Sequence, residues 1–163
     1  MKTSLLNLVL LALLVTTSCK KKKETNGAAP EEVQKNLVKQ DIIVEYTPIY
    51  LSPKAKPIII KWTEYIGVQN KVYELKNTNT VRLKKQLNEL EILMVKLIDS
   101  EYPKQLETHL FERKLDLLSE SVTELKFSLE RKPMTIDYIK RGIFKILIDF
   151  KASKNQINAI YGG

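Results

Sequence analysis

The chain has 163 residues, 44% of them hydrophobic, and a formal net charge of +8. This length suits one domain with its own hydrophobic core. The chain has a single cysteine, which excludes an internal disulfide, so the folded domain must be held together by packing. With only five glycines and one histidine, the chain also lacks a phosphate-binding glycine loop and the residues of a hydrolytic triad.

Half of the net positive charge lies outside the part expected to fold. Residues 57–163 hold eighteen basic residues against fourteen acids, and residues 24–56 hold four lysines against five acids. A nucleic-acid-binding domain instead gathers Lys and Arg on one face among aromatics, so we expect no nucleic-acid partner. Apart from Lys2, the remaining basic residues form a run that we interpret as a contact with an anionic membrane surface or, alternatively, as a solvated spacer. This run consists of Lys20, Lys21, Lys22 and Lys23.

An apolar segment opens the chain. It runs from Leu5 to Val15, is interrupted only by Asn7, and follows the basic residue Lys2. A helix needs about 20 apolar residues to span a bilayer, so the segment is too short to do so. A basic start, a short apolar stretch and small residues at its end are the features of a cleavable export signal. We therefore expect residues 1–18 to be a signal peptide.

Ser18 and Cys19 follow this segment directly, and here residues 1–23 resemble a bacterial lipoprotein precursor. In that family a small residue precedes the cysteine that is acylated and becomes the mature N-terminus. Thr16 departs from the leucine that is commonest at its position, and the lysine run is similar to signals of the Bacteroidetes group. The resemblance implies lipid attachment at Cys19 and, most simply, an outer-membrane location facing the periplasm. The alternatives are a plain signal peptide with an accidental cysteine and an uncleaved anchor.

We expect residues 19–30 to form a flexible basic linker, because residues 24–30 have a small, polar composition. Pro30 followed by two glutamates favours a short helix that ends near Asp41. Residues 42–51 are β-branched or aromatic and carry Pro48, so we expect them to be extended. This arm, residues 31–56, either lies along the bundle and buries its side chains or offers a recognition strand to a partner. The candidate partner contacts on it are Tyr46, Ile49, Tyr50 and Leu51; Tyr65 and Tyr161 are further aromatics expected to be exposed.

Residues 57–163 show helical periodicity, with helices expected at about 57–76, 80–100 and 103–131 and a fourth that starts after Thr135. Short connections between helices of this length predict an all-α fold, an antiparallel up-down-up-down four-helix bundle preceded by the arm. The apolar spacing continues through residues 73–83, so the first two helices could alternatively form one continuous rod.

Few residues in this bundle suggest chemistry. His109 and Glu112 share one helix face and are weak metal candidates, but a single histidine cannot build a di-iron site, and we expect His109 at the surface. No catalytic motif is present, and we expect neither an enzyme nor a cofactor. The sequence favours a membrane-anchored module that binds or scaffolds a protein of the cell envelope. The alternatives are a carrier of haem or metal in the bundle core and an envelope-stress chaperone.

Overall fold

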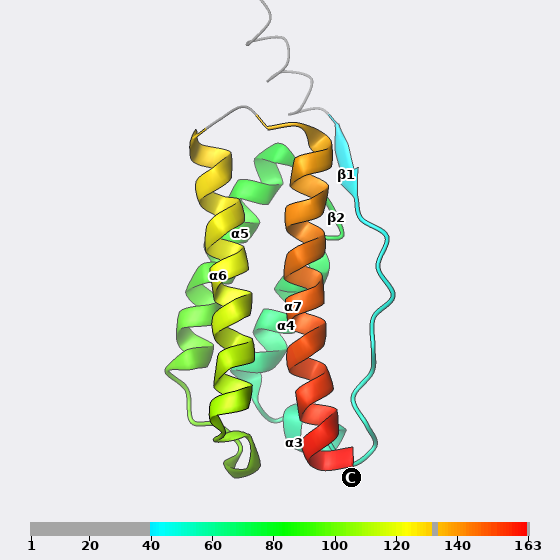
Figure 1. Cartoon of the computed structure of the whole chain (residues 1–163), viewed down its shortest axis with the longest axis vertical. Helices are drawn as coiled ribbons and strands as arrows, with labels where there is room; N and C mark the ends of the chain where they lie inside the picture. Colours follow the sequence, from blue (N-terminus) through cyan, green and yellow to red (C-terminus); the bar gives the residue numbers. More distant parts are fainter. Residues whose placement is uncertain (1–39, 132–133, 163) are drawn as a thin grey trace, which may run out of the picture.

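The fold is a four-helix bundle with an extended arm along one side (Figure 1). In the computed structural model the described residues are 40–131 and 134–162. Their elements in chain order are β1 (Asp41–Ile43), α3 (Lys56–Ile59), α4 (Thr63–Glu74), β2 (Asn77–Asn79), α5 (Thr80–Ile98), the 3₁₀ turn η1 (Lys104–Leu106), α6 (His109–Arg131) and α7 (Ile136–Gly162).

The four long helices close into a ring. α4 packs on α5, α5 on α6 and α6 on α7, while α7 returns to α4 over a shorter stretch. Each helix runs antiparallel to the next one in the chain, because the connections between them are short (Figure 1). The expected up-down-up-down bundle is therefore confirmed.

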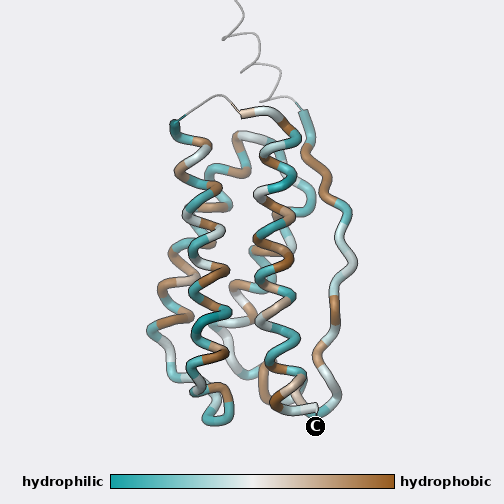
Figure 2. The backbone as a smooth tube through the Cα atoms, viewed as in Figure 1, coloured by the Kyte–Doolittle hydropathy of each residue, from teal (hydrophilic) through white to brown (hydrophobic). Residues whose placement is uncertain are grey.

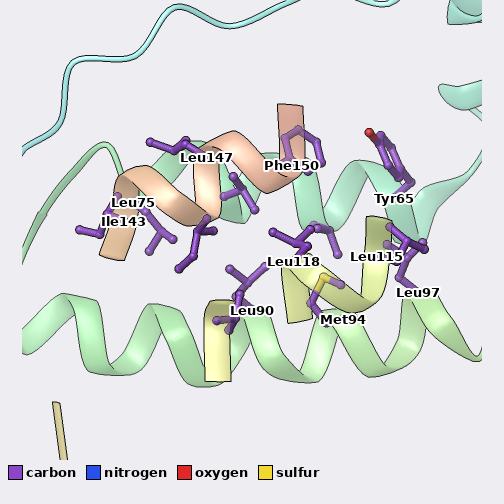
Figure 3. Packing of buried hydrophobic residues seen from close by; sticks show 14 of the residues in the cluster. Tyr65, Leu75, Leu90, Met94, Leu97, Leu115, Leu118, Ile143, Leu147 and Phe150 are labelled. Carbon is purple, nitrogen blue, oxygen red and sulfur yellow. The ribbon is translucent and has the colours of Figure 1, made fainter. Parts of the chain in front are cut away.

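One apolar core fills the bundle. Five apolar residues of α5 are spaced alternately four and three residues apart, and all five are buried: Leu83, Leu87, Leu90, Met94 and Leu97. Leu90, Met94 and Leu97 point between the helices, where Leu115 and Leu118 of α6 and Leu147 of α7 also lie (Figure 3). Apolar and polar residues alternate along each helix, as a half-buried helix requires (Figure 2). Met94 serves packing and is only 1% exposed.

The arm is extended, as the sequence predicted, and packs on the bundle. β1 pairs antiparallel with β2, and Ile42 lies opposite Thr78. Ile42 and Val44 are buried while Ile43 is exposed, which is the two-residue alternation of a strand with one covered face. From β1 the arm runs along α7 to the far end of the bundle (Figure 1). The short helix expected before Asp41 lies outside the described residues apart from its end, where Asp41 begins β1.

The first expected helix, 57–76, is wrong as a single element. It is divided into α3 and α4 because Trp62 has non-helical dihedrals, φ −89° and ψ 87°. That backbone turn accompanies burial of the indole, whose Nε1 donates to Ser100 Oγ at 2.9 Å. The rod alternative is also wrong, since β2 separates α4 from α5, and the Asn79 side chain caps α5 by accepting from Arg82 N.

The third expected helix begins later than predicted. Pro103 precedes the η1 turn instead of opening a long helix. α6 starts after Thr108, whose Oγ1 accepts from Phe111 N at 3.2 Å and so caps it. Leu110, in the first turn of α6, is 54% exposed although it is apolar. Thr135 does cap α7, as expected, by accepting from Tyr138 N.

Candidate functional site

The arm was the sequence's best candidate for a partner contact, and its four candidate residues lie in different settings. Tyr46 and Leu51 pack against the core, and Ile49 is half-buried. Tyr50 is 82% exposed, so its ring is free to meet another molecule. A contact between this region and a partner stays a prediction.

Asn158 of α7 holds the arm in place. Its Oδ1 accepts from Ser52 N at 2.7 Å, and its Nδ2 donates to the Tyr50 carbonyl at 2.8 Å. One side chain thus satisfies both a donor and an acceptor of an extended backbone that β2 does not reach. The arm is thereby fixed along α7 on both sides of Leu51.

A buried lysine lies on the same side of the bundle, between α4 and α7. Lys154 is 3% exposed, and its Nζ donates to Gln69 Oε1 at 2.7 Å and to Tyr73 Oη at 2.8 Å. The ammonium also lies 5.1 Å from the ring centroids of both Tyr73 and Phe150. Tyr46 of the arm packs beside Tyr73, with ring centroids 6.4 Å apart.

Burial changes the proton affinities in this cluster. It lowers the pKa of Lys154 to about 8, since its two hydrogen bonds go to uncharged oxygens within the described part of the chain. Burial raises the pKa of Tyr73 to about 12 and also raises the pKa of Tyr65. Tyr46 Oη is buried and has no hydrogen-bond partner among the residues that the structure describes. The lysine is closed off from solvent, and its amine is engaged by Gln69 and Tyr73.

A second polar group joins α6 to α7. Ser121 Oγ contacts the Asp149 carboxylate, Lys145 Nζ and, at 3.0 Å, the Leu117 carbonyl of its own helix. A serine nucleophile paired with lysine needs an uncharged amine. Lys145 instead lies 3.6 Å from Asp149 and 3.7 Å from Glu124. We interpret this group as a polar contact between helices, beside a cavity of about 200 Å³.

Two shallow hollows adjoin at the connection between α5 and α6, on either side of Tyr102. The first, about 500 Å³, is lined by Ile98, Ser100, Glu101, Tyr102, Glu107, Glu112 and Asp116. The second, about 450 Å³, is lined by Pro57, Ile58, Lys61, Trp62, Glu101, Tyr102 and Pro103. We call the two together the Tyr102 groove. Its acids are scattered along the sequence from 101 to 116, so no sequence motif marks it.

The metal candidates of the sequence do not form a cluster. His109 is at the surface, as expected, with a side chain 96% exposed and Nδ1 3.9 Å from Glu112. Among the described residues, no group of three or more His, Cys, Asp or Glu is placed to hold a metal ion. Most buried side chains of the described bundle are apolar, and the buried polar ones are Thr78, Ser121, Ser153 and Lys154.

Tyr65, expected to be an exposed contact, is fully buried, and that expectation is wrong. Its ring stacks on Trp62 with centroids 5.4 Å apart, and its hydroxyl lies 3.2 Å from Ser153 Oγ. It falls on the same face of α4 as Val68 and Val72, one turn apart. Tyr161 is partly buried and donates to Gln105 Oε1 at 3.2 Å.

The residues of the proposed anchor lie outside the described part of the chain. These are Cys19, Lys20, Lys21, Lys22 and Lys23. None of the helices within residues 40–131 and 134–162 combines the length and apolar composition that crossing a bilayer requires. Comparisons with protein-family models, with curated proteins and with solved structures found no match to this chain.

Proposed function

We propose that the chain is an exported lipoprotein, held at the membrane through acylated Cys19, whose helical bundle binds a protein partner at the cell envelope. One observation carries the anchor: a short apolar run behind a basic start ends in small residues and the only cysteine of the chain. The lysines that follow would add contacts with an anionic bilayer surface. The outer membrane, facing the periplasm, is the proposed location.

Binding, and not catalysis, is the role that the described residues support best. The polar groups inside the bundle, Lys154 and Ser121, are both engaged by neighbouring side chains. The hollows lie at the surface instead and are lined by side chains suited to contacts. The described fold begins with the arm about twenty residues after Cys19, so the bundle would stand away from the bilayer, where a partner could reach it.

The anchor is tested by the Cys19→Ala variant. We expect this variant to lose fatty-acid labelling and to move from the membrane fraction to the soluble fraction of the envelope. Thr17→Ala is the matched control, since it keeps a small residue before the cut and should stay membrane-bound. Unchanged labelling and sedimentation of Cys19→Ala would overturn the anchor.

The binding role is tested by crosslinking in the native envelope followed by identification of the captured protein. We expect one partner that crosslinks to the wild type and competes with excess purified chain. The carrier alternative predicts something different: a stoichiometric metal or Soret absorbance in the purified protein that disappears with His109→Ala. The chaperone alternative predicts suppression of client aggregation without one preferred partner.

A further inference from the structure

We propose that the Tyr102 groove is the docking site for an extended, cationic peptide segment of the partner, one that alternates basic side chains with proline or aliphatic residues. The inference deepens the proposed binding role by naming the chemistry of the partner. It does not depend on how the chain is anchored. The groove lies at the end of the bundle opposite β1, on the connection that leads from α5 to α6 (Figure 1).

The floor of the groove is aromatic and rigid. The Tyr102 ring lies 5.1 Å from Trp62 and 6.0 Å from Phe111, measured between centroids. Trp62 is fixed in turn by its hydrogen bond to Ser100. Because these rings are already ordered, binding an extended segment would cost little side-chain conformational entropy in the groove. Aromatic grooves of this kind are where extended proline-containing segments dock.

The acids of the groove are not neutralised by their neighbours. Four of them line the first hollow, and no Lys or Arg lines it with them: Glu101, Glu107, Glu112 and Asp116. Within the described part of the chain, Glu112 has only the long contact with His109, and the other three have no ion pair. Several acids elsewhere on the bundle are paired, as Glu91 is with Lys126 at 2.6 Å.

The pKa of Tyr102 is affected by burial and by two of the same carboxylates. Burial, followed by the nearby charges of Glu112, Asp116 and Asp99, raises the pKa of its hydroxyl. Carboxylates that gather over a hollow favour cations there and attract them from a distance. Because a metal would need a tighter cluster than the described residues provide, the complementary cation is an ammonium or guanidinium on a flexible side chain.

The two hollows would bind different side chains of such a segment. A lysine or arginine would enter the first hollow among the carboxylates. A proline or leucine next to it would lie in the second, against Pro57, Ile58 and the aromatic rings. Lys61 lines the second hollow, so that side is expected to favour the uncharged residues.

The test uses the full chain, purified in mild detergent, and three fluorescent synthetic peptides. One repeats Lys-Pro-Leu, one repeats Glu-Pro-Leu, and one repeats Lys-Gly-Ser. We expect saturable binding of Lys-Pro-Leu that weakens with salt, with much weaker binding of the other two. Equal binding of Lys-Gly-Ser would overturn the proposal, because the aromatic floor would then contribute nothing.

Charge variants locate the site. Glu107→Gln combined with Asp116→Asn should weaken Lys-Pro-Leu binding about tenfold, equivalent to about 1.4 kcal/mol. Glu45→Gln combined with Glu130→Gln removes the same net charge from exposed positions elsewhere and should leave binding nearly unchanged. Lys61→Glu adds an acid to the rim and should tighten binding about threefold. Equal losses in both double variants would mean unspecific charge attraction and would overturn the proposal.

A peptide with residues 20–29 of this chain completes the test. If it binds more tightly than Lys-Pro-Leu, the occupant is the chain's own lysine segment, and the proposed partner peptide is wrong. If the protein binds none of the peptides but its membrane attachment still depends on Cys19, only the docking proposal is contradicted. If the protein binds the Lys-Pro-Leu peptide but its membrane attachment does not depend on Cys19, only the proposed anchor is contradicted.

Discussion

Lys154 is the residue whose placement is least expected from its chemistry. It continues the inner-face spacing of α7 that runs through Leu147, Phe150 and Ile157, so periodicity places a cation in the core. Its two hydrogen bonds go to uncharged oxygens. A buried charge without an opposite charge is costly, whereas its aliphatic stem packs well.

Replacing this lysine by methionine should therefore stabilise the protein. Lys154→Met keeps an unbranched apolar stem and removes the buried charge, and we expect a gain of about 1–2 kcal/mol at neutral pH. Lys151→Met, one turn earlier on the same helix, should change stability by less than about 0.5 kcal/mol. Urea unfolding measures both. A clear loss of stability in Lys154→Met would mean that its hydrogen bonds outweigh its desolvation.

The same residue predicts an unusual pH dependence. The pKa of Lys154 is about 8 in the folded chain and 10.5 ordinarily, so between these values the unfolded chain holds a proton that the folded chain has released. The free energy of unfolding should then rise as the pH increases from about 8 toward 10, and this gain is lost again as the pH falls through 8. Above about pH 10 the raised pKa of Tyr73 acts in the opposite direction.

Comparing urea midpoints of the wild type and Lys154→Met across this range isolates the lysine. The difference between the two proteins should shrink as the pH rises from about 8 toward 10, because the neutral amine no longer carries the desolvation cost. A difference that stays constant with pH would mean that Lys154 titrates normally.

Alanine substitutions at two helical glycines should change stability in opposite directions. A Cβ at Gly67 would lie 3.5 Å from Leu93, an ordinary contact, whereas one at Gly142 would lie 2.6 Å from Leu125 Cδ1. Gly67→Ala should stabilise the protein by about 0.5–1 kcal/mol through its helix propensity. Gly142→Ala should destabilise it by about 1–2 kcal/mol, since Leu125 is buried where α6 meets α7. Thermal unfolding distinguishes them, and equal shifts would mean that Leu125 moves aside freely.

Among the elements, the arm is the one whose role the sequence left open. Its alternation of covered and exposed residues predicts that neighbouring positions differ sharply. Ile42→Ala should cost about 2–3 kcal/mol because the side chain is fully buried. Ile43→Ala, one residue on and 61% exposed, should cost less than about 0.5 kcal/mol. Similar losses in both would show that the arm docks in another register.

At the scale of the whole molecule, periodicity predicted the bundle well because most core positions repeat along single helices. The five buried residues of α5, the Asn79 cap and the Thr135 cap all follow from local spacing. The predictions that were wrong concern residues whose placement depends on contacts with residues far away in the sequence. Trp62 leaves its helix to meet Ser100, and Tyr65 is buried by Phe150 and Ser153. The Tyr102 groove likewise joins residues from α3 to α6, which no local pattern brings together.

We expect the arm to be part of the cooperative folding unit. α4 and α7 meet over only a short stretch, and the arm lies along α7 beside Tyr73 and Asn158. We therefore expect a chain beginning at residue 53 to be less stable than one beginning at residue 40 by at least about 3 kcal/mol, since Ile42 and Val44 are lost with the arm. Amide hydrogen exchange should rise in α4 and α7 and stay slow in α5 and α6. Equal midpoints and unchanged exchange would make the arm a detachable recognition strand, the alternative that its apolar sequence also permits.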